Sequence, residues 1–473
     1  MRGECTTETQ RSQRKAEYIG FACVVFLCVL CLCPCLPAGR SVVITAMPIS
    51  EETDLLTAVL ERPIVWAYGT HIVAGNIVLM DDSPTDHRRV FVALGDGEWD
   101  GVDSLYVNGE QYFDRTGLSD AAGFLFHPGK PGVAGTGGET GSQTVCRWFP
   151  AGVTQLNFSH TAYASLWIPR DHSAPGPDLD IRGFYRTRKL QEYNSSGTPT
   201  VFQYSANPAW EVLDVLLNLY KLGTARIDFA SFVTAAADCV AQVGGFNRFE
   251  GHVFFTGESG DQVLDRLLTL CRGFLSDYAG KISLRVDQAR GSQHDFTMEN
   301  ISGGGFRWNA GDTRKKPNKV VCQFRDIAAD YAFVEHYADR EAHQTKVNKV
   351  TRAELDLGNS RHGQAFRIAN YLAGRSIDVP ATARLRGLQD SFHLMPGDVV
   401  RIKHDAAPWT YVSGQPDFKS FEVLECSDAA ADERDFLLQE YSAAIYSDTE
   451  EAGQALASPA IAAREGVPGF VTA

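Results

Sequence analysis

Residues 207–240 read NPAWEVLDVLLNLYKLGTARIDFASFVTAAADCV and predict two helices joined by a short link. Asn207 is a good N-cap, and Pro208 fits the first helical position, where no amide hydrogen is needed. We expect Gly223 to adopt the left-handed conformation that ends the first helix, and Asp228 to cap the second. The stretch contains no arrangement typical of catalysis, so it favours a part of an assembly over an enzyme.

The next segment continues this mixed pattern. Residues 243–257, VGGFNRFEGHVFFTG, are expected to form a hairpin because glycines flank aromatic and β-branched residues. Ser259 and Gln262 have the spacing of a capping box, and the helix that they start is expected to end near Gly273. One face of this helix is apolar and belongs to the core: Val263, Leu264, Leu267, Leu268 and Cys271. The alternating strand pattern of residues 281–286 follows, so this region is α+β.

Residues 47–180 are rich in predicted strands. Apolar runs such as IVWAY, NIVLM, RVFVAL and SLYVNG alternate with Gly, Asp and Asn, which predicts a β-sandwich or small barrel. Asn108 and Gly109 form a strong signal for a type I′ hairpin turn, and residues 161–169 predict another strand. The glycine-rich stretch 127–143 has no following Gly-Lys-Ser/Thr, so we expect a flexible loop and no phosphate cradle.

The C-terminal part returns to strands, beginning with VVCQFRD at residues 320–326. A helix follows whose apolar stripe is typical of core packing: Ala365, Ile368, Ala369 and Leu372. Residues 395–398, MPGD, predict a turn between strands. From residue 447 the chain is rich in Ala and Glu without periodicity, and it is expected to be a flexible tail.

An ordered series of stretches resembles the tail-tip hub proteins of long-tailed bacteriophages, the family of the lambda tip attachment protein J. The stretches are residues 62–82, 93–112, 207–257, 314–326, 362–375, 394–402 and 436–446. The resemblance implies an α+β fold, mostly β, in which several small sandwich or barrel domains carry an inserted helical α+β module. It implies these units: a hydrophobic extension 1–46, a β-rich hub domain 47–180, an α+β module 181–310, a β-rich hub domain with one helix 311–446, and a tail 447–473.

The same resemblance implies a structural role. Proteins of this family form a ring, expected to be a homotrimer, at the end of the tail tube. They contact tail-tip, tail-tube and tape-measure proteins, and the resemblance implies transient contact with the host envelope. We therefore expect a virion component, the baseplate hub of a phage or prophage tail tip, that is assembled in the host cytoplasm and takes part in host attachment and DNA delivery.

The N-terminus permits a second interpretation. The run IGFACVVFLCVLCLC at residues 19–33 follows Arg11, Arg14 and Lys15 and has the form of a signal peptide or short anchor. Its apolar core is shorter than the ~20 residues that a spanning helix needs. Because the hub resemblance begins near Met47, residues 1–46 are also explained as an upstream extension from a misplaced start. If the run is a true signal, the alternative is an exported β-rich ligand-binding protein.

Charge and cysteine content exclude other classes. The net charge of −14 leaves no basic footprint for phosphate backbones, so sequence-specific nucleic-acid binding is not expected. Six of the 11 cysteines precede residue 36. The others stand alone in apolar contexts and predict free buried thiols: Cys146, Cys239, Cys271, Cys322 and Cys426.

No catalytic, cofactor-binding or metal-binding residues are predicted, and we expect no enzyme. The acidic pairs are expected to cap or to be solvated: Glu258 with Asp261, and Asp81 with Asp82. The histidines lack metal-ligand spacing and are expected to be scattered: His160, His336, His362 and His393. The tryptophans are expected to pack in cores and not to form a sugar platform: Trp66, Trp99, Trp148, Trp167 and Trp210.

Overall fold

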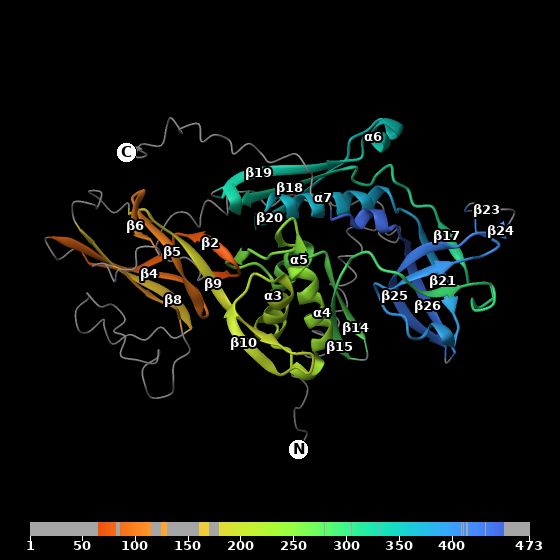
Figure 1. Ribbon diagram of the computed structural model, residues 1–473, viewed down its shortest axis with the longest axis horizontal. Coiled ribbons are helices and arrows are strands. Elements are labelled where there is room, and N and C mark those ends of the chain that lie inside the picture. Colours follow the sequence, from red (N-terminus) through yellow and green to blue (C-terminus); the bar gives the residue numbers. More distant parts are fainter. Residues whose placement is uncertain are drawn as a thin grey trace, which may run out of the picture.

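The computed structural model describes most of the chain between residues 65 and 448. The described residues are 65–81, 86–114, 124–129, 160–169, 179–278, 280–303, 305–329, 331–407, 409, 411–412, 415–430 and 432–448. Their fold is α+β and mostly β, with several small sheets, so the expected fold class is confirmed. Figure 1 shows two β-rich ends and, between them, a group of helices that lies under a small sheet with its own helix.

The N-terminal end consists of two sheets. One has the order β3-β4-β8-β7, formed by β3 (Asn76–Asp81), β4 (His87–Asp96), β8 (Thr161–Pro169) and β7 (Phe124–His127). The other has the order β10-β9-β5-β6, formed by β10 (Pro199–Tyr204), β9 (Ile181–Tyr193), β5 (Trp99–Val107) and β6 (Glu110–Asp114), with β2 (Thr70–Val73) also paired to β9. Val90 and Leu166 of the first sheet share a core with Leu105 and Tyr185 of the second, as in a sandwich.

Two local predictions in this part are confirmed. The strand expected at 161–169 is β8, and the turn between β5 and β6 has positive φ at Asn108 (51°) and Gly109 (84°). Type I′ turns need this conformation at both central residues, and glycine and asparagine adopt it with little strain. Apart from residues 127–129, the glycine-rich stretch predicted as a loop lies outside the described residues.

The first central helix begins as predicted and ends differently. The Asn207 side chain accepts a bond from the Ala209 amide at the start of α3 (Pro208–Asp214), which continues into the π-helical turn η1 (Val215–Leu219). The prediction for Gly223 is wrong, because its φ is −69°. Lys221 has the left-handed φ of 54°, and the next amide bonds back to the Leu216 carbonyl. The left-handed residue that ends the helix is therefore Lys221, two residues before the predicted glycine.

The second helix, α4 (Phe229–Val240), begins after Asp228, but the aspartate side chain makes no capping bond. Instead, the Ser231 hydroxyl donates to the Asp228 carbonyl at 2.7 Å and accepts from the Leu284 amide at 3.0 Å. Ser231 therefore joins the first turn of α4 to β15 (Lys281–Val286), and a tertiary contact replaces the expected local cap.

The hairpin expected at 243–257 is much shorter. Only β11 (Gln242–Val243) and β12 (Phe246–Asn247) pair with each other, around two glycines of positive φ. The end of the stretch, β13 (Phe254–Phe255), pairs with β1 (Trp66–Ala67) from the N-terminal part. The Phe255 and Trp66 rings stack with their centroids 5.9 Å apart, so burial of aromatic surface explains the distant pairing.

The third helix, α5 (Gly260–Leu270), has the predicted capping box of Ser259 and Gln262, and its predicted core face is buried. It ends just before β14 (Gly273–Tyr278), which pairs with β15. A short 3-10 turn, η2 (Thr224–Arg226), lies between the first two helices. Two others, η3 (Ile327–Ala329) and η4 (Gln389–Ser391), lie later in the chain.

The remaining chain forms two further sheets. The smaller has the order β19-β18-β20, formed by β19 (Ala332–Asp339), β18 (Lys319–Asp326) and β20 (Arg352–Ser360), with α7 (His362–Ile377) packed on β18 and β19. The larger has the order β16-β22-β25-β26-β21-β17, formed by β16 (Ser292–Phe296), β22 (Val399–Ile402), β25 (Lys419–Ala430), β26 (Glu433–Glu440), β21 (Thr382–Gly387) and β17 (Arg307–Asn309). Minor elements are α6 (Glu341–Val347), β23 (Tyr411–Val412), β24 (Gln415–Pro416) and η5 (Ala443–Tyr446). The predicted strand 320–326, the helix stripe and the turn at 395–398 are confirmed.

Three large cores hold these parts together. One belongs to the sandwich, and another, with Phe296, Phe421 and Phe436, to the six-stranded sheet. The largest joins the central helices to β18 and α7 through residues such as Cys322 and Ile368. Cys239, Cys271 and Cys322 are free and buried, as predicted, and Cys426 is half-buried and free. The predicted domain limits stay predictions.

The Asn207 cap provides a direct test of the first helix. The side chain also donates to the Ala236 carbonyl at 3.0 Å, so it ties α3 to α4. We expect Asn207→Ala to lower the free energy of unfolding by about 1–2 kcal/mol, measured by urea denaturation. Asp228→Ala is the matched control, because Asp228 makes no capping bond, and equal losses in the two variants would contradict this interpretation.

Candidate functional site: two polar joints between the cores

The residues singled out for chemistry make local contacts. Asp81 pairs with Arg89 at 3.1 Å, and Glu258 lies 3.9 Å from Arg266. Asp261 accepts a hydrogen bond from the Tyr220 hydroxyl. Asp82 lies outside the described residues.

The histidines are less scattered than predicted. The rings of His336 on β19 and His362 on α7 meet edge to face with centroids 4.8 Å apart, beside Phe366. His393 lies 5.7 Å from His294, and His160 stands alone at a turn with φ of 64°. His336 and His362 meet because α7 packs on β19, and their spacing along the chain gives no sign of this contact. In the described residues, no group of three or more His, Cys, Asp or Glu is arranged to hold a metal.

The described tryptophans pack against other protein groups. Trp99 and Trp210 are buried in cores, Trp66 stacks on Phe255, and Trp167 stacks on His87 with centroids 4.7 Å apart. Trp148 lies outside the described residues. The arrangement agrees with the expected packing, and the absence of a sugar platform stays a prediction.

Polar side chains instead gather at two places where the cores meet. We call the place that links the sandwich to the central helices the first joint. The Tyr68 hydroxyl donates to Asp214 at 2.6 Å. Arg188 bridges Asp214 and Asp96, each at 3.1 Å, and lies 4.1 Å above the Trp66 ring. The Arg188 guanidinium is thus held between two carboxylates and an aromatic face, and it connects β9 to α3.

Two buried histidines complete the first joint. His252 Nδ1 accepts from the Thr70 amide at 2.9 Å, so its proton is on Nε2, which faces Glu250 at 3.5 Å. His71 Nδ1 accepts from the Asn359 amide at 2.9 Å, which leaves Nε2 to donate to the Tyr68 carbonyl at 2.8 Å. Burial, with His252 nearby, lowers the pKa of His71 to about 3, so the ring is neutral and serves as a fixed connector.

Gly69 makes this approach possible. Its φ is 77°, and a Cβ placed on it would lie 2.3 Å from the Gly251 carbonyl and 2.4 Å from His252 Nδ1. Any side chain there would separate the sandwich from the loop that carries the histidine. The close backbone contact therefore requires glycine.

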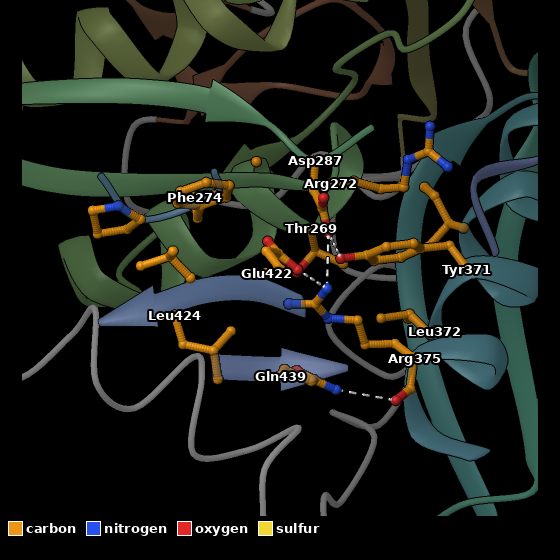
Figure 2. A pocket seen from close by; sticks show the side chains of 15 residues that line it. Thr269, Arg272, Phe274, Asp287, Tyr371, Leu372, Arg375, Glu422, Leu424 and Gln439 are labelled. Carbon is orange, nitrogen blue, oxygen red and sulfur yellow. Dashed lines mark hydrogen bonds and ion pairs between the residues drawn. The ribbon is translucent and has the colours of Figure 1, made fainter. Parts of the chain in front are cut away.

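The second joint lies between α7 and the six-stranded sheet (Figure 2). Arg375 of α7 donates to Glu422 of β25 and lies 3.4 Å from Asp287, which also accepts from the Tyr371 hydroxyl. The Tyr446 hydroxyl accepts from Arg375 at 3.4 Å. All five groups are buried, and four of them, all but Tyr446, border a small cavity whose other walls are mainly apolar, including Phe274 and Leu424.

In the second joint, Arg375 is the cation that forms ion pairs with both Glu422 and Asp287, so the joint is sensitive to its loss. Burial raises the pKa of Glu422 to about 7, against the attraction of Arg375. Burial and the neighbouring Asp287 carboxylate raise the pKa of Tyr371, so its hydroxyl keeps its proton and donates. Burial opposes the charge of Arg375, but Glu422, Tyr371 and Asp287 outweigh it and raise the pKa of the guanidinium.

The charged groups of each joint pair with one another: Arg188 with Asp214 and Asp96, and Arg375 with Glu422 and Asp287. What this arrangement can do is hold three cores at fixed positions. Sequence reasoning missed these residues, although Arg367, Tyr371 and Arg375 recur every four residues on α7, beside its apolar stripe. Polar side chains that recur beside the apolar stripe of a helix were the sequence signal that could have predicted this joint.

Removing the cation tests the second joint. We expect Arg375→Met to cost about 3–5 kcal/mol of unfolding free energy, because Glu422 and Asp287 are left buried without a positive partner. Adding Glu422→Gln should restore part of this loss. Arg314→Met is the control, since Arg314 is 80% exposed and pairs only with Asp312. Similar small losses in urea denaturation for both arginine variants would show that the joint contributes little.

A separate buried acid lies in the helical core. Glu211 on α3 has no exposed surface, and neither carboxyl oxygen has a hydrogen-bond partner among the described residues. Burial raises the pKa of Glu211 well above its usual value, and nearby Cys271, Asp214 and Glu250 raise it further. Burial therefore favours the neutral, protonated form of this carboxyl.

This carboxyl gives a pH dependence of definite sign. Its stabilising contribution is complete below the unfolded pKa of about 4.3 and is lost as pH rises toward the raised folded pKa. Relative to Glu211→Gln, the wild-type chain should lose up to about 1.4 kcal/mol of stability per pH unit over this interval. Urea denaturation at pH 5 and pH 8 measures the difference, and parallel curves for the two proteins would contradict the assignment.

Comparison with known proteins gives one family match. Residues 259–412, which include α5, the small sheet and α7 with Arg375, Tyr371 and Asp287 of the second joint, match the model of a family described as "Putative phage tail protein". The match covers about a third of the chain. No curated protein sequence is significantly similar to this chain.

Among solved structures, a chain in the virion of a native gene transfer agent particle is similar over 94% of this chain and 98% of its own, with a TM-score of 0.55 and 14% identity. A 43 kDa tail protein of prophage MuSo2 from Shewanella oneidensis (82% and 100% covered, TM-score 0.31, 10% identity) and a tail protein from Neisseria meningitidis MC58 (80% and 96%, 0.31, 10%) also match. The family match supports a phage tail protein, and the chain shares its fold with a component of a virion-like particle.

Proposed function

We propose that this protein is a structural component of the tail tip of a long-tailed phage or prophage, the baseplate hub. It assembles as a ring, a homotrimer, at the end of the tail tube and takes part in host attachment and DNA delivery. The observation that carries the proposal is the match of residues 259–412 to a phage tail family. The fold shared over nearly the whole chain with a gene transfer agent component supports it.

The two joints support a mechanical role. A tail component has to keep its parts in place under load, and buried charge networks resist shear because displacement exposes unpaired charges to a low-dielectric interior. In this proposal the chain is no enzyme and has no cofactor. Its partners are its own copies and the tail-tip, tube and tape-measure proteins, with transient contact to the host envelope.

Exposed apolar side chains on edge strands support self-association. β10 ends one sheet of the sandwich and exposes Val201 and Phe202, and β19 ends the small sheet and exposes Phe333 and Tyr337. An exposed strand edge with large apolar side chains is a ready surface for pairing with another chain. These two edges are our candidates for contacts between copies.

The alternative, an exported ligand-binding protein, depends on residues 1–46, which lie outside the described residues. Among the helices that the structure describes, none combines the length and apolar character needed to span a bilayer. No described feature favours the exported protein, so the tail role is the single function proposed.

Assembly is the direct test. The protein begun at Met47, and the full chain beside it, should form trimers or rings by light scattering and electron microscopy. Phe202→Glu and Tyr337→Glu should each weaken association about tenfold or more if the edge carries the contact, without changing the stability of the monomer. Met298→Glu is the control, because Met298 is 54% exposed but lies in a turn. A monomer at all concentrations, or one that needs residues 1–46 and binds a glycan, would overturn the proposal.

A further inference from the structure

The last described residues return to the central core. After β26, η5 packs Ile445 and Tyr446 against Tyr371 and Val379 of the α7 region. The chain then places Asp448 between two arginines. Asp448 Oδ1 accepts from Arg272 at 3.1 Å, and Oδ2 accepts from Arg248 at 3.0 Å. The single Asp448 carboxylate thus bridges two guanidinium groups, one just after β12 and one just after α5.

This arginine pair has capacity for more acceptors. Arg272 is 4% exposed, and its Nε and Nη1 have no hydrogen-bond partner among the described residues. Its guanidinium lies 4.9 Å from the Phe249 ring centroid and 5.3 Å from that of Tyr371, so aromatic faces hold it in place. Arg248 donates to Gln288 at 2.9 Å and to Asp448, while its Nε has no partner in the same part of the chain.

A third cation lies against the same loop. The buried Arg367 of α7 donates through Nη2 to the Arg248 carbonyl at 2.6 Å. The Arg367 guanidinium therefore lies against the backbone of Arg248, and in the described part of the chain Asp448 forms ion pairs with both Arg248 and Arg272. Buried guanidinium groups are normally met by carboxylate or phosphate oxygens, so the site suits an anionic partner.

The chain itself supplies that partner. Residues 448–451 read DTEE, so two further carboxylates follow Asp448 within three residues. At roughly 3.3–3.6 Å per extended residue, they lie within about 10 Å of it along the chain. The length and the charge of this segment both fit the arginine cluster.

We propose that Arg248, Arg272 and Arg367 form a docking site for an acidic segment, and that its occupant is the run 448–451 of the same chain. The docked segment straps the six-stranded sheet, through β26 and η5, to the helical core. Any continuation of the chain then leaves from the helical core and not from the end of the sheet. The site operates in the single chain, whatever the state of assembly.

Hydrogen exchange of the full chain tests the proposal. The peptide covering residues 447–452 should exchange on the order of tenfold more slowly than the unprotected rate, and about 1 M NaCl should remove most of this protection. The triple variant Asp448→Asn, Glu450→Gln, Glu451→Gln should lose it. Glu465→Gln, a charge change later in the same tail, is the control and should keep it.

Charge exchange provides a second readout if an arginine variant is unstable. Arg248→Glu should release the 447–452 peptide, and Arg248→Glu combined with Asp448→Arg should restore part of the protection. Two outcomes would overturn the proposal: exchange of this peptide at the unprotected rate in the wild-type chain, or equal protection in the wild-type and triple-variant chains.

Discussion

The position of the six-stranded sheet depends on Arg375. This one guanidinium faces Glu422 of the sheet and Asp287 of the helical core, and all three groups are removed from water. Desolvation of each charge is costly, so the contact is stable only when the three are together. A buried ionic group of this kind adds little to stability over an apolar core, but it accepts only one relative position of the parts that it joins.

The first joint applies the same constraint at the other end of the molecule. The neutral His71 and, beside it, His252 connect the backbone of the sandwich to the loop before α5 and to the end of β20, and Arg188 connects the sandwich to Asp214 of the helices. Gly69 allows the two backbones to touch. The helical core is therefore held from both sides by directional bonds.

Local signals predicted local structure well. The Asn207 cap, the Asn108–Gly109 turn and the Ser259–Gln262 capping box depend on atoms within three residues, so neighbouring sequence contains the whole interaction. Predictions failed where a distant partner competes. β13 leaves the expected hairpin to stack Phe255 on Trp66, and His336 meets His362 only because α7 packs on β19.

The sequence by itself determined the mixed, mostly β character, the position of most helices and strands, and the absence of a recognised catalytic motif, because composition and periodicity depend on neighbouring residues alone. Only the tertiary structure decided which charges meet. Arg375 lies 47 residues from Glu422, and His71 lies 288 residues from Asn359. Such pairs form when packed cores bring their surfaces together and exclude water, and no spacing along the chain encodes that geometry.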